Sequence, residues 1–357
     1  MHLMTLDTGI FNNAFLNSKR LLADPLADNF IEEVFTDPIK KSELLKWLGN
    51  ELGKSELRLL KSLYPDIEFI QKADILPAWA DRQLMRRGSA LFVRNSEMVM
   101  NLLGLLSLPY CYTAANGAMV LYLSELITKQ TTKRLFDTAI FVWEVMGPDA
   151  YEETGNAYVE ILKIRIIHAL VRYHTLLSEK WKHTWGMPIN QEDMAGTNLS
   201  FSLIVTRGMK KLGIKVSPQD EEAFLHVWSV IGHLMGLNED LIPKNKWEAD
   251  NLDLAIKDRE FRASNHGAEL TQSLINHIMS VNTSKATADD IIGLMRYLLG
   301  NEIADMLSMK KATLPSYKLM LLKSLNFLKQ LKPHGPLNAV YNKSYTAFKA
   351  LKPTLKK

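Results

Sequence analysis

Apolar residues recur along this chain at intervals of three and four, the spacing of one face of an α-helix. No stretch alternates apolar and polar residues for long enough to predict a strand, and no internal repeat is visible. We therefore predict an all-α, multi-helix protein, with helix starts at the Asp-Pro pairs 24–25 and 37–38. From residue 125 onwards the pattern predicts helices over 125–146, 158–181, 190–209, 220–237, 248–281, 287–309 and 316–332.

The predicted helix over 158–181 is apolar on most of its circumference, which is typical of a helix buried at the centre of a protein. Its aliphatic residues are Ile161, Leu162, Ile164, Ile166, Ile167, Leu170 and Val171. Its middle also carries Arg165, His168 and Arg172, and their spacing places all three on one face. Arginine and histidine are strongly hydrated, so we expect buried partners for these side chains.

A second stretch, 98–124, contains 27 residues without a charge, which is long enough to span a bilayer. Pro109, Asn116 and Gly117 interrupt it, and the sequence SLPYCYTAANGA is typical of a break between two helices. We favour a pair of buried helices that line an apolar cavity. A membrane-spanning helix is the alternative.

Composition narrows the class of protein. A length of 357 residues suits two domains or one large helical domain, and we expect one domain over 1–310, followed by a basic helix and a loose tail over 311–357. The net charge of +4 is too small to indicate nucleic acid as a partner. Cys111 is the only cysteine, which excludes internal disulfides and cysteine-built metal sites. The first 20 residues lack the pattern of a secretory signal, so we expect a cytoplasmic protein.

Several catalytic and metal-binding patterns are absent from the chain. There is no Glu-x-x-His motif of di-iron bundles, no His-Glu-x-x-His motif, no Gly-rich phosphate loop and no Gly-x-Ser-x-Gly elbow. His266 and Glu269 are interpreted as part of a solvated helix face. His226 and His233 are interpreted as core histidines with satisfied hydrogen bonds.

The face with His168 has two possible uses. The imidazole could ligate one metal ion while Arg165 and Arg172 bind carboxylates such as haem propionates. Alternatively, the arginines pair with buried acids of neighbouring helices and His168 donates to a backbone carbonyl. On spacing alone the second interpretation is favoured, since Arg-x-x-His-x-x-x-Arg is a weak pattern.

Several segments resemble, in the same order, the latex-clearing protein (rubber oxygenase) and mpaB-type oxygenase family. They are Asp24-Pro-Leu-Ala-Asp28, Gly88-Ser-Ala-Leu-Phe-Val-Arg94, Ser107-Leu-Pro109, Arg165-Ile-Ile-His168, Trp185-Gly-Met-Pro-Ile-Asn-Gln-Glu-Asp193 and Glu222-Ala-Phe-Leu-His-Val-Trp228. The resemblance covers roughly residues 20–245, and WGMPINQED is its most specific segment.

This resemblance implies a globin-like helical core with extra N- and C-terminal helices, and a b-type haem whose iron is bound by His168 from the proximal side, beside Arg165 and Arg172. On the distal side the family has Arg-x-x-Lys-Thr, and the matching residues are Arg134, Asp137 and Thr138. Asp137 departs from the family lysine and would place a negative charge near bound dioxygen unless a cation such as Arg134 pairs with it.

The function implied is an oxygenase that uses dioxygen to cleave or oxidise a carbon–carbon double bond of an apolar, isoprenoid-like substrate. The alternative is a non-catalytic helical protein that keeps the fold and binds a lipid, an isoprenoid or haem. The basic helix over 316–332 carries Lys318, Lys323, Lys329 and Lys332. Its charged face is interpreted as solvated, with contact to an anionic membrane surface as the less favoured alternative.

Overall fold

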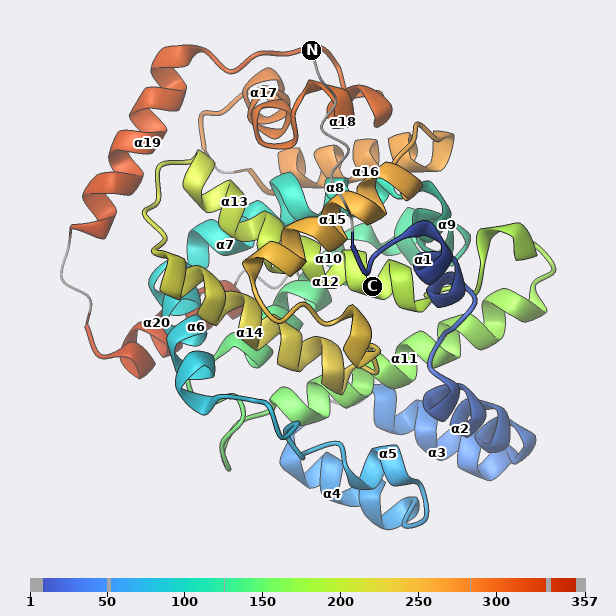
Figure 1. Ribbon diagram of the computed structural model, residues 1–357. Coiled ribbons are helices and arrows are strands. Elements are labelled where there is room, and N and C mark those ends of the chain that lie inside the picture. The colour runs from blue at the N-terminus through green and yellow to red at the C-terminus, as the bar shows by residue number, and fades with distance from the viewer. Residues whose placement is uncertain (1–8, 50–52, 125, 283, 332–334, 351–357) are drawn as a thin grey trace.

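The computed structural model describes residues 9–49, 53–124, 126–282, 284–331 and 335–350, and within these ranges every regular element is a helix. The elements up to the middle of the chain are α1 (Asn13–Arg20), α2 (Pro25–Thr36), α3 (Pro38–Gly49), α4 (Lys54–Leu63), α5 (Glu68–Gln71), α6 (Arg82–Arg94), α7 (Ser96–Leu102), η1 (Leu103–Ser107), α8 (Leu108–Thr113), α9 (Ala115–Leu123), α10 (Leu126–Met146) and α11 (Ala157–Leu177). They are followed by η2 (His183–Trp185), α12 (Gln191–Phe201), α13 (Leu203–Lys211), α14 (Pro218–Leu234), η3 (Glu239–Leu241), α15 (Lys246–Glu260), α16 (Asn265–Val281), α17 (Ala288–Leu299), α18 (Asn301–Met306), α19 (Ser316–Gln330) and α20 (Leu337–Ala350). The all-α prediction is confirmed (Figure 1).

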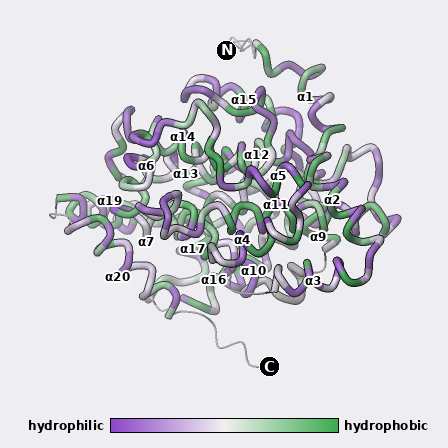
Figure 2. Tube along the Cα trace, turned by 90° about the horizontal axis from the view of Figure 1, so that it is seen from below, coloured by the Kyte–Doolittle hydropathy of each residue, from purple (hydrophilic) through white to green (hydrophobic). Residues whose placement is uncertain are grey.

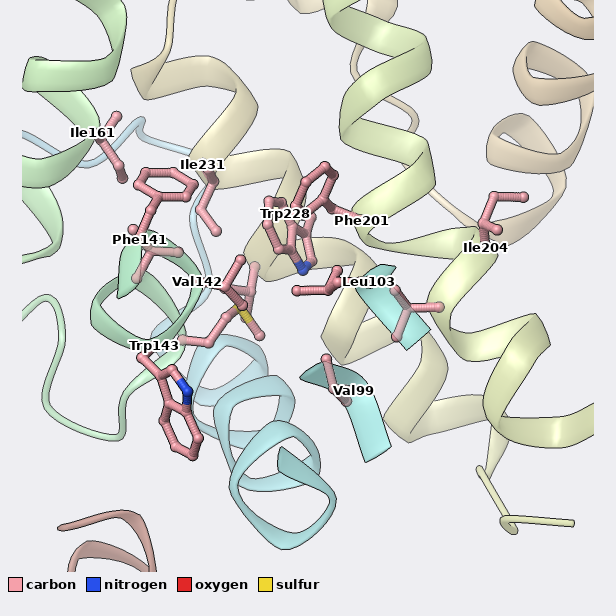
Figure 3. Packing of buried hydrophobic residues seen from close by; sticks show 14 of the residues in the cluster. Val99, Leu103, Phe141, Val142, Trp143, Ile161, Phe201, Ile204, Trp228 and Ile231 are labelled. Carbon is pink, nitrogen blue, oxygen red and sulfur yellow. The ribbon is translucent and has the colours of Figure 1, made fainter. Parts of the chain in front are cut away.

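Helix α11 is the central element that the apolar pattern predicts. It contacts α2, α4, α10 and α14, and its aliphatic residues enter the main hydrophobic core. Figure 3 shows Ile161 of α11 together with Phe141 and Val142 of α10 and Ile231 of α14. A helix with neighbours on several sides must be apolar around most of its circumference, which explains its composition.

Helices α6 and α14 pack closely against each other. A Cβ atom on Gly88 would lie 2.4 Å from the carbonyl oxygen of Ala223, so only glycine lets the two backbones approach this closely. This contact accounts for the glycine in the segment GSALFVR.

The uncharged stretch 98–124 is buried and broken, as predicted. The amide of Leu108 donates to the carbonyl of Leu103, five residues back, which makes η1 a π-helical turn directly before Pro109. A second break follows at Ala114, where α8 ends and α9 begins. Among the described residues, no helix combines the length and the apolar character needed to cross a membrane.

Three of the long helices predicted from periodicity are each two helices. The predicted helix over 190–209 is interrupted at Ser202, the one over 248–281 at Phe261, and the one over 287–309 at Gly300, whose φ is +88°. After Phe261 the amide of Arg262 donates to the carbonyl of Thr113, 3.1 Å away. A contact between distant segments therefore replaces the next helical hydrogen bond, and helical periodicity alone does not reveal it.

The expectation of a loose C-terminal tail is wrong for residues 337–350, which form α20. The ring of Tyr345 stacks on Trp143 with centroids 5.3 Å apart, and its hydroxyl donates to Glu144 Oε1 at 2.6 Å. The Tyr341 hydroxyl donates to the carbonyl oxygen of Trp143 at 2.9 Å. Aromatic burial thus holds α20 against α10. The boundary expected at residue 310 remains a prediction.

Candidate functional site

His168 lies on α11, and its side chain is half-buried. Its Nδ1 atom is buried and has no hydrogen-bond partner among the described residues. The pKa of His168 is lowered to about 3, mainly because burial disfavours the charged form; the charges of Arg172 and Arg134 also lower it, and the Asp24 carboxylate opposes them. The imidazole is therefore neutral at physiological pH, which is the form that binds a metal ion. The alternative in which His168 donates to a carbonyl is wrong.

The two neighbouring arginines pair with the N-terminal segment. Arg165 donates from Nε to Asp24 Oδ2 at 2.6 Å and from Nη2 to Asp24 Oδ1 at 2.9 Å, and Nη1 donates to the carbonyl of Leu234. Arg172 donates from Nε to Asp28 Oδ1 at 2.6 Å. Both acids belong to the segment DPLAD, so the pairing of arginines with buried acids of a neighbouring helix is confirmed.

All three side-chain nitrogens of Arg165 already donate hydrogen bonds within the protein, and its expected cofactor-binding role remains a prediction. Arg172 differs, since its Nη2 atom is buried without a hydrogen-bond partner in the described part of the chain. A role of Arg172 toward a cofactor therefore stays a prediction.

Gln191, in the segment WGMPINQED, helps to hold the Asp24 carboxylate in place. The Gln191 side chain donates from Nε2 to the carbonyls of Ala23 (2.6 Å) and Gly236 (2.9 Å), and its Oε1 accepts the amide of Asn238 (2.8 Å). Gly236 has φ +88°, and a Cβ atom there would lie 2.4 Å from Asp24 Oδ2. Gln191 and Gly236 thus fix Asp24 against Arg165, and through it the turn of α11 that carries His168. Sequence reasoning recognised this segment but not its contacts.

A buried charge cluster lies next to this frame. Arg20 Nη1 lies 3.1–3.3 Å from carboxylate oxygens of Glu192, Asp193 and Glu260, and Arg259 pairs with Glu192 at 2.8 Å. Three carboxylates thus share two guanidiniums. Burial raises the pKa of Asp193 to about 7, since the attraction of Arg20 offsets only part of the cost of desolvating its charge.

The amide of Asp193 donates to the Asn190 side chain at 2.9 Å, so Asn190 caps the N-terminus of α12.

Arg134 lies on α10, is half-buried, and is close enough to Tyr112 and Cys111 of α8 to interact with them electrostatically. No carboxylate pairs with it within the described residues, and burial lowers its pKa despite the nearby Tyr112 and Cys111. Its positive charge also lowers the pKa of His168. The structure therefore brings Arg134 and His168 to a shared interior region.

Asp137 does not share that region. Its side chain is 57% exposed and pairs with Lys133, one turn earlier on α10, at 2.7 Å. Solvent and the lysine satisfy the carboxylate, and the expected distal role of Asp137 remains a prediction. Thr138 is half-buried, and its role remains a prediction.

Three other histidines, His226, His233 and His266, contact polar groups away from His168. His226 Nε2 accepts the amide of Asp81 at 2.8 Å, and the Nδ1 of half-buried His233 lies 3.5 Å from a Glu239 oxygen. His266 Nε2 lies 2.6 Å from the carbonyl of Ala115. No group of three metal-type ligands occurs among the residues that the structure describes. A metal bound here would therefore have to bring most of its own ligands, as iron does in a porphyrin.

The fold and this site define an all-helical protein whose central helix carries a half-buried histidine, His168, with no hydrogen-bond partner for its Nδ1 atom among the described residues. Comparison with known proteins identifies the family. The sequence model of the family described as "ER-bound oxygenase mpaB/B'/Rubber oxygenase, catalytic domain" matches residues 96–323. The chain belongs to this family.

Two relatives extend the match. Rubber oxygenase of Streptomyces sp. (strain K30) is 31% identical over 248 residues, which are 68% of this chain and 60% of that protein, so the match spans less than two thirds of its length. The structure of latex clearing protein LCP in the closed state has a TM-score of 0.70 at 26% identity and covers 95% of this chain and 92% of its own. The resemblance seen in the sequence is confirmed.

Proposed function

We propose that this protein is a haem b-dependent oxygenase that uses dioxygen to cleave or oxidise a carbon–carbon double bond of an apolar, isoprenoid-like substrate. One observation carries the proposal. His168 is neutral and half-buried, its Nδ1 atom is buried without a hydrogen-bond partner among the described residues, and it lies on the central helix of a chain in the mpaB and rubber oxygenase family. An unsatisfied buried imidazole costs about 1–3 kcal/mol of stability, so a use for it is expected.

The residues present fit a b-type haem. His168 would hold the iron from one side, and the ion pairs of Arg165 and Arg172 fix the turn of α11 from which it projects. A haem held in this way supplies the activation of dioxygen. Because the pKa of His168 is lowered to about 3, its imidazole is neutral at physiological pH and would bind the iron in that form.

Arg134 is the residue proposed to act on the oxygen side. A guanidinium without a carboxylate partner can donate hydrogen bonds to oxygen atoms that gain negative charge, and half-buried Arg134 has no such partner among the described residues. The half-buried residues Leu105, Leu121 and Leu135 pack against the core and offer an apolar surface that would exclude water and position an alkene. The expected apolar cavity remains a prediction.

A non-catalytic relative that keeps the fold is the second candidate. The observation that favours it is Asp137, which stands where the family pattern has lysine and faces solvent with Lys133. In that case the protein would bind haem or an isoprenoid without turning it over.

Reconstitution with hemin tests the haem site. The wild-type protein and the control His226→Ala are expected to show a Soret band, whereas His168→Ala is expected to lose it while keeping its far-UV circular dichroism. His226 is a fair control because its Nε2 already has a backbone donor away from the site. Folded protein that takes up no hemin, or a His168→Ala variant with an unchanged band, would refute the proposal.

Catalysis is tested on the loaded protein. A short oligo-isoprenoid incubated under air is expected to yield aldehyde or ketone fragments detectable by mass spectrometry, and Arg134→Ala is expected to yield fewer. Haem binding without any product in the wild type would favour the non-catalytic candidate.

A further inference from the structure

Helix α19 lies at the edge of the molecule (Figure 1 and Figure 2). Several of its apolar side chains are exposed to solvent. The exposed residues recur at three- and four-residue intervals and therefore form one stripe along the helix. They are Tyr317 (67% exposed), Met320 (68%), Leu321 (57%), Leu325 (48%), Leu328 (55%) and Leu331 (65%). A helix that covers a core normally shows the reverse pattern, with its apolar face inward.

The opposite face of α19 is fixed to the protein. Asn326 is buried and donates to the carbonyl of Leu212 at 2.9 Å. Gln330 accepts the amide of Lys215 at 3.1 Å, and Lys318 donates to both oxygens of Asp290 at 2.7–2.8 Å. These contacts set the rotation of the helix, so its apolar stripe cannot turn inward without breaking them.

The stripe is unusual among the exposed apolar residues of this protein. Elsewhere in the described chain, large exposed apolar side chains occur singly or in small groups, which is normal for soluble surfaces. A continuous exposed apolar stripe is typical of an interaction surface.

The charge around the stripe indicates its partner. Residues 306–357 contain eleven lysines and no aspartate or glutamate, whereas the formal net charge of the whole chain is only +4. On α19 the lysines stand at the edges of the stripe: Lys318, which pairs with Asp290, and Lys329, which pairs with Glu97, lie on one side, and Lys323 lies on the other side over the ring of Tyr297. An apolar stripe bordered by lysines is the pattern of a helix that lies in the headgroup region of an anionic bilayer.

We propose that α19 docks this protein on an anionic lipid surface, with the apolar stripe inserted among the upper acyl chains and the lysines at the headgroups. Fifteen residues span roughly 22 Å, which is too short to cross a hydrocarbon core of about 30 Å, so the helix lies along the surface. A second copy of the chain fits less well, because pairing two α19 helices would bring their lysines together. Through the proposed function, docking would place an oxygenase of apolar alkenes beside the phase in which such substrates dissolve.

Vesicle flotation of the full-length protein tests the proposal without any need for haem. The wild type is expected to float with vesicles of phosphatidylcholine and phosphatidylglycerol, more weakly with phosphatidylcholine alone, and less as salt is added. Leu321→Ser combined with Leu328→Ser is expected to weaken binding roughly thirtyfold or more. Lys323→Gln combined with Lys329→Gln is expected to weaken binding to the anionic vesicles about fivefold per lysine.

The matched control is Leu59→Ser combined with Ile75→Ser, which removes side chains that are 50% and 58% exposed elsewhere and is expected to float like the wild type. Three results would overturn the proposal. They are a wild type that fails to float with anionic vesicles, a Leu321/Leu328 variant that floats unchanged while folded, and the loss in that variant of a concentration-dependent dimer, which would assign the stripe to a second copy.

Discussion

Replacing Asp24 by asparagine tests the ion pair that holds the His168 helix. Asparagine keeps the shape of the side chain and an oxygen that can still accept the amide of Ala27 at the start of α2, so only the charge is removed. Arg165, whose side chain is only 13% exposed, would then be a buried cation without a counter-ion. Breaking a buried pair in this way costs about 3–5 kcal/mol.

We expect a value near the lower end, about 3 kcal/mol, because Arg165 keeps its bond to Leu234 and lies over the ring of Phe69, 5.1 Å from its centroid. Chemical denaturation followed by circular dichroism measures the change in the free energy of unfolding. The control is Asp137→Asn, which removes the exposed partner of Lys133 and is expected to change stability by less than about 0.5 kcal/mol.

A double-mutant cycle with Arg165→Met separates the pair from other effects. The double variant should be more stable than the sum of the two single changes predicts, with a coupling energy of at least about 2 kcal/mol. Additive effects, or an Asp24→Asn variant as stable as the control, would show that the pair does not hold α11.

Three further predictions concern packing, pH and the distal helix. Gly88→Ala should lower the free energy of unfolding by about 3 kcal/mol, because its Cβ would collide with the Ala223 carbonyl. Gly104→Ala, whose Cβ would meet nothing closer than 3.8 Å, should not destabilise the protein. Thermal unfolding compares the two variants. The pKa of Asp193 is raised from 3.8 to about 7, so between these pH values the folded state binds a proton that the unfolded state has lost. This group therefore makes the free energy of unfolding fall as pH rises through that interval. Denaturation at several pH values should show a flatter stability profile for Asp193→Asn. Asp137→Lys should leave the absorption spectrum of hemin-loaded protein unchanged, since the side chain at this position faces solvent, and a shift to a six-coordinate form would contradict its placement.

The helical class and the position of the central helix could be predicted from sequence because both depend on local periodicity. The breaks at Phe261 and Gly300 could not, because tertiary contacts and a single backbone angle end those helices. The aromatic contacts of α20 with Trp143 join residues about two hundred positions apart, so no local pattern contains them.

The candidate site divides in the same way. The place of His168 on an apolar helix was predicted from periodicity, whereas Arg134 was singled out only through the family resemblance, and the roles of both remain predictions. The partner of Arg165 was described only as a buried acid of another helix, because 141 residues separate it from Asp24. The direction of Asp137 was missed, since a motif assigns a residue to a helix but does not say whether Lys133 and solvent already satisfy its charge.

The contacts of Gln191 have a consequence for the order in which the chain folds. They join Ala23 to residues 236 and 238, so the segment around Asp24 has no complete binding site until residue 238 has been synthesised. At about 5–20 residues per second, this leaves the N-terminal helices without their partners for roughly 10–40 s on the ribosome. The first part of the chain to be made is therefore fixed late, and the His168 helix acquires its frame only after two thirds of the 357 residues have been synthesised.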